Sequence, residues 1–306
     1  MVAAGGEVAA GPAGRVAGRP QAPPVPAPPP SCLCLSRSPC RRRGRAVSGE
    51  TKYNKAKLLQ GQGVDEPLSQ FGFQQAEAAG KFLSNIHFTH VFSSDLQRAK
   101  QTASAIVLNN NCGSKPDIIC DARLRERKYG IVEGKPLNDL RAMAKAAGQK
   151  CPFFTPPGAE TLSEVQARAE DFFNYLCQLL AQSTEEENGE PDHHADYSGD
   201  VFVSLKNPSC ANFSSSELND DSSGTRVIAN VLIVSHGGFI RQWVRHFIED
   251  LKCLLPQSFD ESKAFSVCPN TAMSSFIITF NQVASFSPWI MCDSLYNCSH
   301  LDDLSL

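Results

Sequence analysis

Three separated segments of this sequence carry side chains that could act together on an anionic group. The segment SSDLQR ends in Arg98, whose planar guanidinium matches the oxygens of a phosphate. Glu126, in the mixed-charge run RLRERKYG, could transfer a proton. His236, in the segment SHGG, could donate a hydrogen bond, and the N–H of Gly237 beside it could bind an anion. Taken alone, each has a plainer interpretation: a solvated helix residue, one charge of an exposed run, and a helix cap.

Alternating strand and helix patterns predict how these residues are held. Apolar runs indicate strands at 90–94, 118–119, 231–234 and 276–280, the last of which would close the sheet. Helical spacing of apolar residues is expected from 69 to 83 with Phe73 on the apolar face, after Asp95, and at 137–147, 161–180 and 239–251. This order predicts a three-layer α/β/α fold with a mainly parallel sheet. His236 would then stand at the carboxyl end of a strand, where open α/β sheets bind ligands.

The chain divides into parts of different composition. Residues 1–45 are rich in Ala, Gly, Pro and Arg without any Lys, and we expect them to form a disordered extension. Residues 46–295 are predicted to form the domain, with a flexible, acidic and Ser-rich insertion at about 182–226 and a tail at 296–306. The arginines between 41 and 45 suggest a mitochondrial transit segment, but the prolines disfavour the helix that it needs. An alternative first exon or a misjoined reading frame explains this composition better.

Composition argues against several classes of function. A net charge of −3 gives no sign of a nucleic-acid partner, and no stretch approaches the ~20 apolar residues of a membrane span. The twelve cysteines are scattered and follow no secretory signal, so we expect reduced thiols. Neither the group Cys32, Cys34 and Cys40 nor the pair His193-His194 has the setting of a metal site. We predict no metal and no cofactor, and the sequence does not indicate an oligomeric state.

Together, the order and spacing of these segments resemble the histidine phosphatase (phosphoglycerate-mutase-like) superfamily, from about Gly49 to Phe280. The stretches that carry the resemblance are QGQGVDEPLS, FTHVFSSDLQRAKQT, RLRERKYGIVEGK, LRAMAKAA, FTPPGAET, LIVSHGG and CPNTAMSSFII. The resemblance implies a metal-independent phosphomonoester hydrolase, closest to the fructose-2,6-bisphosphatases that lower a glycolytic activator. Its partner would be a small phosphorylated metabolite, a sugar bisphosphate or a phosphoglycerate. It implies a cytoplasmic protein, with mitochondrial association as an alternative.

The resemblance also implies roles for single residues. Glu126 and His236 would be the catalytic residues that remain in this chain. Glu126 would protonate the leaving alkoxide and then activate water, and His236 would donate a hydrogen bond to the phosphate. Arg98, Asn54 and Gly237 would bind the phosphate.

One part of the family pattern is missing. The family begins with a buried strand that ends in Arg-His-Gly-Glu-Thr, where the His accepts the phosphoryl group and the Arg holds it. Here the segment Gly49-Glu50-Thr51 remains, but Val47 stands in the Arg position and Ser48 in the His position. No other histidine is placed to replace it, and Ser48 has no evident base to activate it. We therefore predict that this chain is inactive or nearly so.

The strand before this motif is altered as well. Residues 39–46 read PCRRRGRA, and four arginines cannot be buried between helices without partners. At most Ala46 and Val47 would add a stub of strand, which predicts a severe loss of stability. Two alternatives to an enzyme therefore stay open: a non-catalytic isoform that binds a phosphate ligand or a protein partner, and an unstable gene-model variant.

Overall fold

The computed structural model describes residues 45–113, 115–186, 200–203, 229–256, 259, 264–266, 268–281 and 288–304. Its strands are β1 (Arg45–Val47), β2 (His90–Ser93), β3 (Ile118–Cys120), β4 (Asp200–Val203), β5 (Val231–Ser235), β6 (Met273–Asn281) and β7 (Trp289–Asn297). They form one sheet in the order β3-β2-β5-β1-β6-β4, with β7 also paired to β6. Within this sheet only β6 runs against its neighbours, so the sheet is mainly parallel, as predicted.

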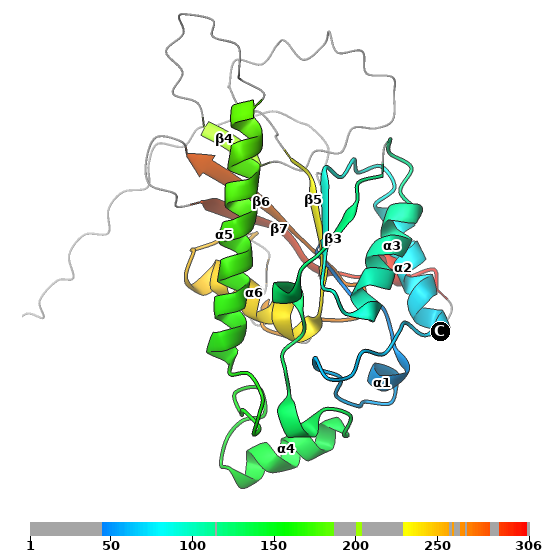
Figure 1. Ribbon diagram of the computed structural model, residues 1–306, viewed down its shortest axis with the longest axis vertical. Helices are drawn as coiled ribbons and strands as arrows, with labels where there is room; N and C mark the ends of the chain where they lie inside the picture. The colour runs from blue at the N-terminus through cyan, green and yellow to red at the C-terminus, as the bar shows by residue number, and fades with distance from the viewer. Residues whose placement is uncertain are drawn as a thin grey trace, which may run out of the picture. The chain divides into compact units, whose positions relative to one another are not determined.

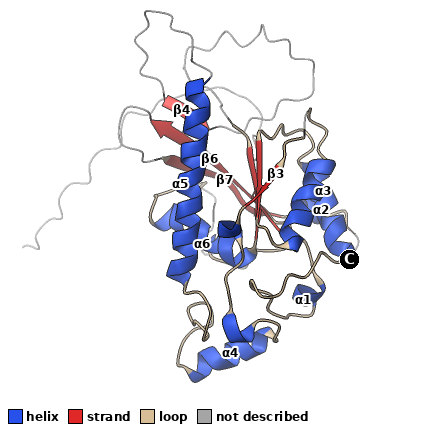
Figure 2. Ribbon diagram, viewed as in Figure 1, coloured by secondary structure: helices blue, strands red, loops and turns tan. Residues whose placement is uncertain are grey.

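Helices cover both faces of this sheet (Figures 1 and 2). The helices are α1 (Lys52–Lys55), α2 (Gln70–Phe82), α3 (Gln97–Leu108), α4 (Leu137–Ala146), α5 (Leu162–Glu186) and α6 (Gly237–Glu249). Of these, α5 and α6 pack on one face of the sheet and α2 and α3 on the other, whereas α1 and α4 lie beyond the strand ends. The start of α2 is fixed by Ser69, whose hydroxyl accepts a hydrogen bond from the N–H of Gly72. The predicted three-layer α/β/α class is confirmed.

The two core layers meet at β5, whose five residues are all buried. Successive side chains of a strand point to opposite faces of the sheet. Val231 and Ile233 therefore pack in the core under α5 and α6, whereas Leu232 and Val234 pack in the core under α2 and α3. A strand buried on both faces explains why this segment is apolar throughout.

The described part of the first strand is short, and it begins at the first described residue, Arg45. β1 has three residues, and it pairs in parallel with β5 and antiparallel with β6, where Arg45 lies opposite Ser274. Each further residue of β1 would pair one position farther along β6, so a strand four residues longer would reach Ile278. Val203 of β4 pairs with Ile278 instead. β4 therefore lies on the edge of β6 that a full-length first strand would cover.

Several predicted boundaries are corrected by the structure. The segment 182–226 is not wholly an irregular insertion, because α5 continues to Glu186 and β4 belongs to the sheet. β6 does not close the sheet, because it has paired strands on both sides. The domain also extends past residue 295, because β7 runs to Asn297. The remainder of 182–226, including His193-His194, and the extension 1–44 lie outside the described residues.

Two side chains are placed differently from the sequence expectation. His300, in the predicted polar tail 296–306, packs against the domain: it is 9% exposed, its ring lies 5.8 Å from that of Phe82, and its Nε2 is 3.0 Å from the hydroxyl of Thr271. Phe73 on α2 is 38% exposed, so this position does not belong to the core. Periodicity predicts the face of a helix but not which of its residues another layer covers.

Candidate functional site

Three adjacent parallel strands, β2, β5 and β1, have their carboxyl ends side by side. The N–H of Ser48, after β1, donates a hydrogen bond to the carbonyl of Ser235 in β5 at 3.0 Å. On the other side of β5, the N–H of Ser94 donates to the carbonyl of Val234 at 2.9 Å. Neighbouring strands lie about 5 Å apart. Ser48, His236 and Ser94 are therefore neighbours at the carboxyl edge, where the sequence predicts His236 to be.

His236 is a buried, neutral imidazole. It is 2% exposed, and its Nε2 lies 2.8 Å from the hydroxyl of Ser94. Its Nδ1 is buried without a hydrogen-bond partner among the described residues. Burial, followed by the positive charges of Arg98 and Arg168, holds the pKa of His236 well below its usual value. If the Ser94 hydroxyl donates to Nε2, then Nδ1 carries the proton and can donate it to an anion.

Arg98 on α3 supplies a desolvated positive charge. It is 2% exposed, and its Nη1 and Nη2 donate to the carbonyls of Val64 at 3.1 Å and Gly61 at 2.9 Å. A guanidinium has five N–H groups, so three of them have no hydrogen bond in the described part of the chain. Burial lowers the pKa of Arg98, and nearby carboxylates, Glu126 first, act in the opposite direction. This fork suits the oxygens of a phosphate.

The loop whose carbonyls hold this guanidinium is organised by Glu133, a residue that sequence reasoning missed. Its carboxylate accepts hydrogen bonds from the N–H groups of Gln62 at 3.1 Å, Gly63 at 2.8 Å and Tyr129 at 2.8 Å. A Cβ atom on Gly61 or Gly63 would collide with the same carboxylate. The two glycines of QGQG were the available signal, but they do not reveal which side chain approaches them.

Glu126 binds the first turn of α6. Its Oε1 accepts hydrogen bonds from the N–H groups of Arg127 at 2.7 Å and Phe239 at 3.0 Å, and its Oε2 accepts from Gly238 at 3.0 Å. A Cβ atom on Gly238 would collide with this carboxylate. Part of the helix N-terminus expected to bind phosphate is thus occupied by the predicted proton donor, while the N–H of Gly237 has no hydrogen bond within the described residues.

Arg168 of α5 holds the backbone that carries Glu126, and sequence reasoning gave it no role. Its Nη1 donates to the carbonyls of Arg123 at 2.6 Å and Arg125 at 3.1 Å, and its Nη2 donates to the carbonyl of Glu126 at 3.4 Å. Glu160 pairs with Arg168 at 2.8 Å. These contacts join residues 42 to 45 positions apart, a separation over which no local pattern could predict them.

The turn after β1, where Val47 and Ser48 stand in the family's Arg and His positions, is held by hydrogen bonds from several elements. Asn54 and Thr51 cap α1 reciprocally: Oδ1 of Asn54 accepts from the N–H of Thr51 at 3.0 Å, and the Thr51 hydroxyl accepts in return at 3.2 Å. Nδ2 of Asn54 donates to Asn270 at 3.1 Å, and the N–H of Gly49 donates to the Thr102 hydroxyl at 3.0 Å. The amide of Asn54, predicted to bind phosphate, is therefore used for the cap, with one N–H left.

Ser48 is the residue at the expected phosphate-accepting position. It is 6% exposed, and its hydroxyl makes no hydrogen bond among the described residues. His90 is the first residue of β2, at the amino end of that strand and away from Ser48, and His246 lies in α6. His300 lies beyond Thr271, whose N–H donates to the carbonyl of Ser48 at 3.4 Å and whose hydroxyl is 3.0 Å from Nε2 of His300. Among the described histidines, none forms a hydrogen bond with Ser48.

The carboxyl ends of these strands therefore lie near three groups: the guanidinium of Arg98, the imidazole of His236 and the carboxylate of Glu126 at the start of α6. Within the described residues, Arg98 keeps N–H groups and His236 keeps Nδ1 without hydrogen bonds. Such a set can neutralise a phosphate and supply a proton to a leaving group. The fold and this arrangement define an α/β protein whose candidate site has the chemistry to bind an anion such as phosphate.

Comparison with known proteins agrees with this class. The model of the Histidine phosphatase superfamily (branch 1) matches residues 48–185. Fructose-2,6-bisphosphatase TIGAR from Xenopus laevis is 49% identical over 261 residues, covering 84% of this chain and 93% of the relative. The protein of the same name from Mus musculus is 44% identical over 262 residues, covering 84% of this chain and 94% of the relative.

A solved structure shows the same fold. The phosphoglycerate mutase from Bacillus anthracis str. Sterne matches with a TM-score of 0.56 at 21% identity, covering 85% of this chain and 96% of the other. The chain belongs to the histidine phosphatase superfamily. None of the helices in the described part is long and apolar enough to cross a membrane.

Proposed function

We propose that this chain is a fructose-2,6-bisphosphatase-type protein that retains the phosphate site and has lost hydrolysis, or nearly so. The substrate class is supported by the relatives named fructose-2,6-bisphosphatase TIGAR, at 49% and 44% identity. The ligand would be a small phosphorylated metabolite: a sugar bisphosphate first, a phosphoglycerate second. By the same resemblance the protein would act in the cytoplasm.

The observation that carries the proposal is the identity of residue 48. Ser48 follows β1 directly beside His236, at the position that the family pattern gives to the phosphate-accepting histidine. A serine hydroxyl needs an adjacent base to become a nucleophile. His236 does not offer one readily, because burial makes it a weak base and its Nε2 already contacts Ser94.

The remaining residues support binding and proton transfer. Arg98 and the free nitrogen of His236 would hold the phosphate oxygens, and the N–H of Gly237 and the remaining N–H of Asn54 would add donors at the rim. In a chain with a histidine at position 48, its imidazole would attack phosphorus while the bond to the sugar oxygen breaks. Glu126 would give that oxygen a proton, and water would then release phosphate.

The test is phosphate release from fructose-2,6-bisphosphate by the purified full chain and by its Val47→Arg, Ser48→His double variant. We expect turnover only in the double variant. Turnover by the unchanged chain that is lost in Glu126→Gln would contradict the proposed inactivity. Turnover by neither would mean that the shortened β1 has disrupted the site itself.

Binding without chemistry is the second half of the proposal and has its own measurement. Orthovanadate and fructose-2,6-bisphosphate should raise the unfolding temperature of the unchanged chain, and Arg98→Ala should abolish this rise. If neither ligand stabilises the chain, retention of the site is wrong, and the unstable gene-model variant becomes the better explanation.

A further inference from the structure

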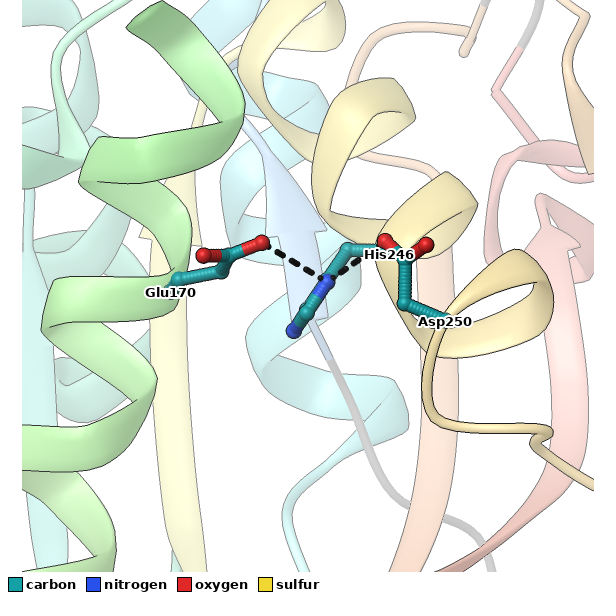
Figure 3. A group of neighbouring side chains, drawn as sticks. All are labelled: Glu170, His246 and Asp250. Atoms are coloured by element: carbon teal, nitrogen blue, oxygen red, sulfur yellow. Dashed lines mark hydrogen bonds and ion pairs between the residues drawn. The ribbon is translucent and has the colours of Figure 1, made fainter. Parts of the chain in front are cut away.

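A second cluster of ionisable side chains lies away from the phosphate site, where α5 meets the C-terminal end of α6 (Figure 3). Glu170 comes from α5, His246 from the last turn of α6, and Asp250 from the residue that ends α6. Nδ1 of His246 lies 3.1 Å from Oε1 of Glu170 and 2.9 Å from Oδ2 of Asp250. The imidazole is nearly buried, whereas the two carboxylate side chains are 41% and 48% exposed, so the cluster is open to solvent.

Gln166, one turn before Glu170 on α5, completes a ring of polar atoms. Its Nε2 donates to the same two oxygens, at 3.1 Å to Glu170 and 2.8 Å to Asp250. All four sides of the ring, between 2.8 and 3.1 Å, are therefore close to 3 Å. The three donor atoms of Glu170, His246 and Asp250 all lie within 4.8 Å of one another. Ligand atoms about 2.1 Å from a tetrahedral Zn²⁺ are about 3.4 Å apart, so small side-chain rotations would place one ion between them.

The cluster also carries excess negative charge. Nδ1 of His246 carries at most one proton, and its hydrogen bond to Asp250 uses that proton. Glu170 lies at ion-pair distance from the same nitrogen but receives no proton from it. Among the described residues, no lysine or arginine pairs with Glu170 or Asp250. The carbonyl end of α6 adds partial negative charge at this place. A cation would balance these charges.

We propose that Glu170, His246 and Asp250, with Gln166, bind a divalent first-row transition-metal ion, Zn²⁺ being the best fit. Two facing helices that each present ligands one turn apart are an arrangement by which helical proteins hold metals. Imidazole and carboxylate donors together suit Zn²⁺ and its neighbours. The ion takes the place of the Nδ1 proton, which moves to Nε2, and the Gln166 amide turns so that its oxygen faces the ion. The bound ion ties α5 to α6, and this role does not depend on the proposed phosphate chemistry.

Titration of the full chain with Co²⁺ tests the site, because Co²⁺ bound by thiolates gives an intense charge-transfer absorption that nitrogen and oxygen ligands do not. This matters in a chain with twelve cysteines. We expect weak visible bands without the thiolate absorption, together with a higher unfolding temperature. The exposed-site variants Glu170→Gln and Asp250→Asn should fold normally and bind Co²⁺ roughly 10–100-fold more weakly. His193→Ala combined with His194→Ala serves as the matched control and should leave binding unchanged.

Gln166→Glu distinguishes a metal site from a ring held only by hydrogen bonds. A third carboxylate would repel the other two in a metal-free ring, and added Co²⁺ would not restore the lost stability. In a metal site it supplies a stronger ligand, so Co²⁺ affinity should rise about tenfold and the unfolding temperature should recover. Equal Co²⁺ affinity in the unchanged chain, Glu170→Gln and Gln166→Glu would overturn the proposal, as would thiolate absorption that accounts for all bound metal.

Discussion

β1 and β5 are parallel neighbours whose carboxyl ends both border the candidate site, yet they contribute to it in different ways. β5 has five buried residues and leads through His236 into α6, whose first turn binds Glu126. β1 has three residues and leads into Ser48. The end of β1 is nevertheless held in register, because Ser48 donates to Ser235 and Gly49 donates to Thr102.

This difference indicates that the position of a site and its chemistry depend on different parts of the sequence. The turn after β1 is held mainly by contacts outside the strand, from Glu50 to Ser69 and Gln75 of the α2 region and from Gly49 to α3. The turn therefore does not depend on β1 alone. The reacting atom, in contrast, belongs to one side chain, and no neighbouring contact can replace an imidazole.

The largest expected effect restores the missing chemistry at the end of β1. Val47→Arg with Ser48→His should raise phosphate release on the order of 10⁴-fold or more, because losses of a covalent nucleophile are of that size. Ser48→His alone should give less, since the second guanidinium, which Val47→Arg adds beside Arg98, is still missing. Trapping an acid-labile phosphohistidine at position 48 in the double variant would verify the pathway. If that intermediate is not found in an active variant, the two strand ends do not cooperate as described.

A smaller effect is expected at the α6 side of the site. In the active double variant, Glu126→Gln should lower kcat roughly 10²–10⁴-fold, because a neutral amide cannot transfer the proton. The amide can still accept one or two of the backbone hydrogen bonds, so the fold should be preserved, as circular dichroism would check. An unchanged kcat would remove Glu126 from the proposed mechanism.

The next effect concerns binding in the unchanged chain. Arg98→Lys keeps the charge but loses the planar fork, including the bonds to Gly61 and Val64. At about 1.5–3 kcal/mol for hydrogen bonds to charged groups, affinity for orthovanadate should fall roughly 10–100-fold in a calorimetric titration. Lys100→Arg, on the exposed side of the same helix, is the control. Equal affinity in both variants would place the phosphate elsewhere.

The smallest effect is on stability as a function of pH. The pKa of His236 is lowered in the folded protein and that of His300 is lowered to about 4, chiefly by burial in both cases. The unfolded chain then binds more protons than the folded one, so the free energy of unfolding should decrease as pH falls from about 6.5 toward 4. Urea unfolding at several pH values measures this slope. His300→Asn should make the slope shallower, whereas Ser48→His should not remove it.

Sequence reasoning predicted the layers well because the buried face of a strand or helix requires apolar residues at a regular spacing. β5 is an almost continuous apolar run, and α3 carries its apolar residues at helical spacing. Both patterns can be recognised within a short stretch of sequence. The stub predicted for the first strand stays a prediction, because the arginines at 41–43 that would interrupt it lie outside the described residues. Sequence reasoning missed β7 as a named strand and placed the domain boundary inside it, because its side chains alternate only weakly between buried and exposed.

By itself, the sequence determined the fold class and showed that Ser48 stands where the family has a histidine; it also predicted Arg98, Glu126 and His236 as site residues. Only the tertiary structure decided how these residues are held: Glu133 on the loop that binds Arg98, Arg168 behind Glu126, and β4 on the exposed edge of β6. The physical reason is distance along the chain. Side-chain types and periodicities are local properties, whereas a carboxylate that approaches two glycines, or an arginine that binds three distant carbonyls, is selected by packing between segments that no local pattern connects.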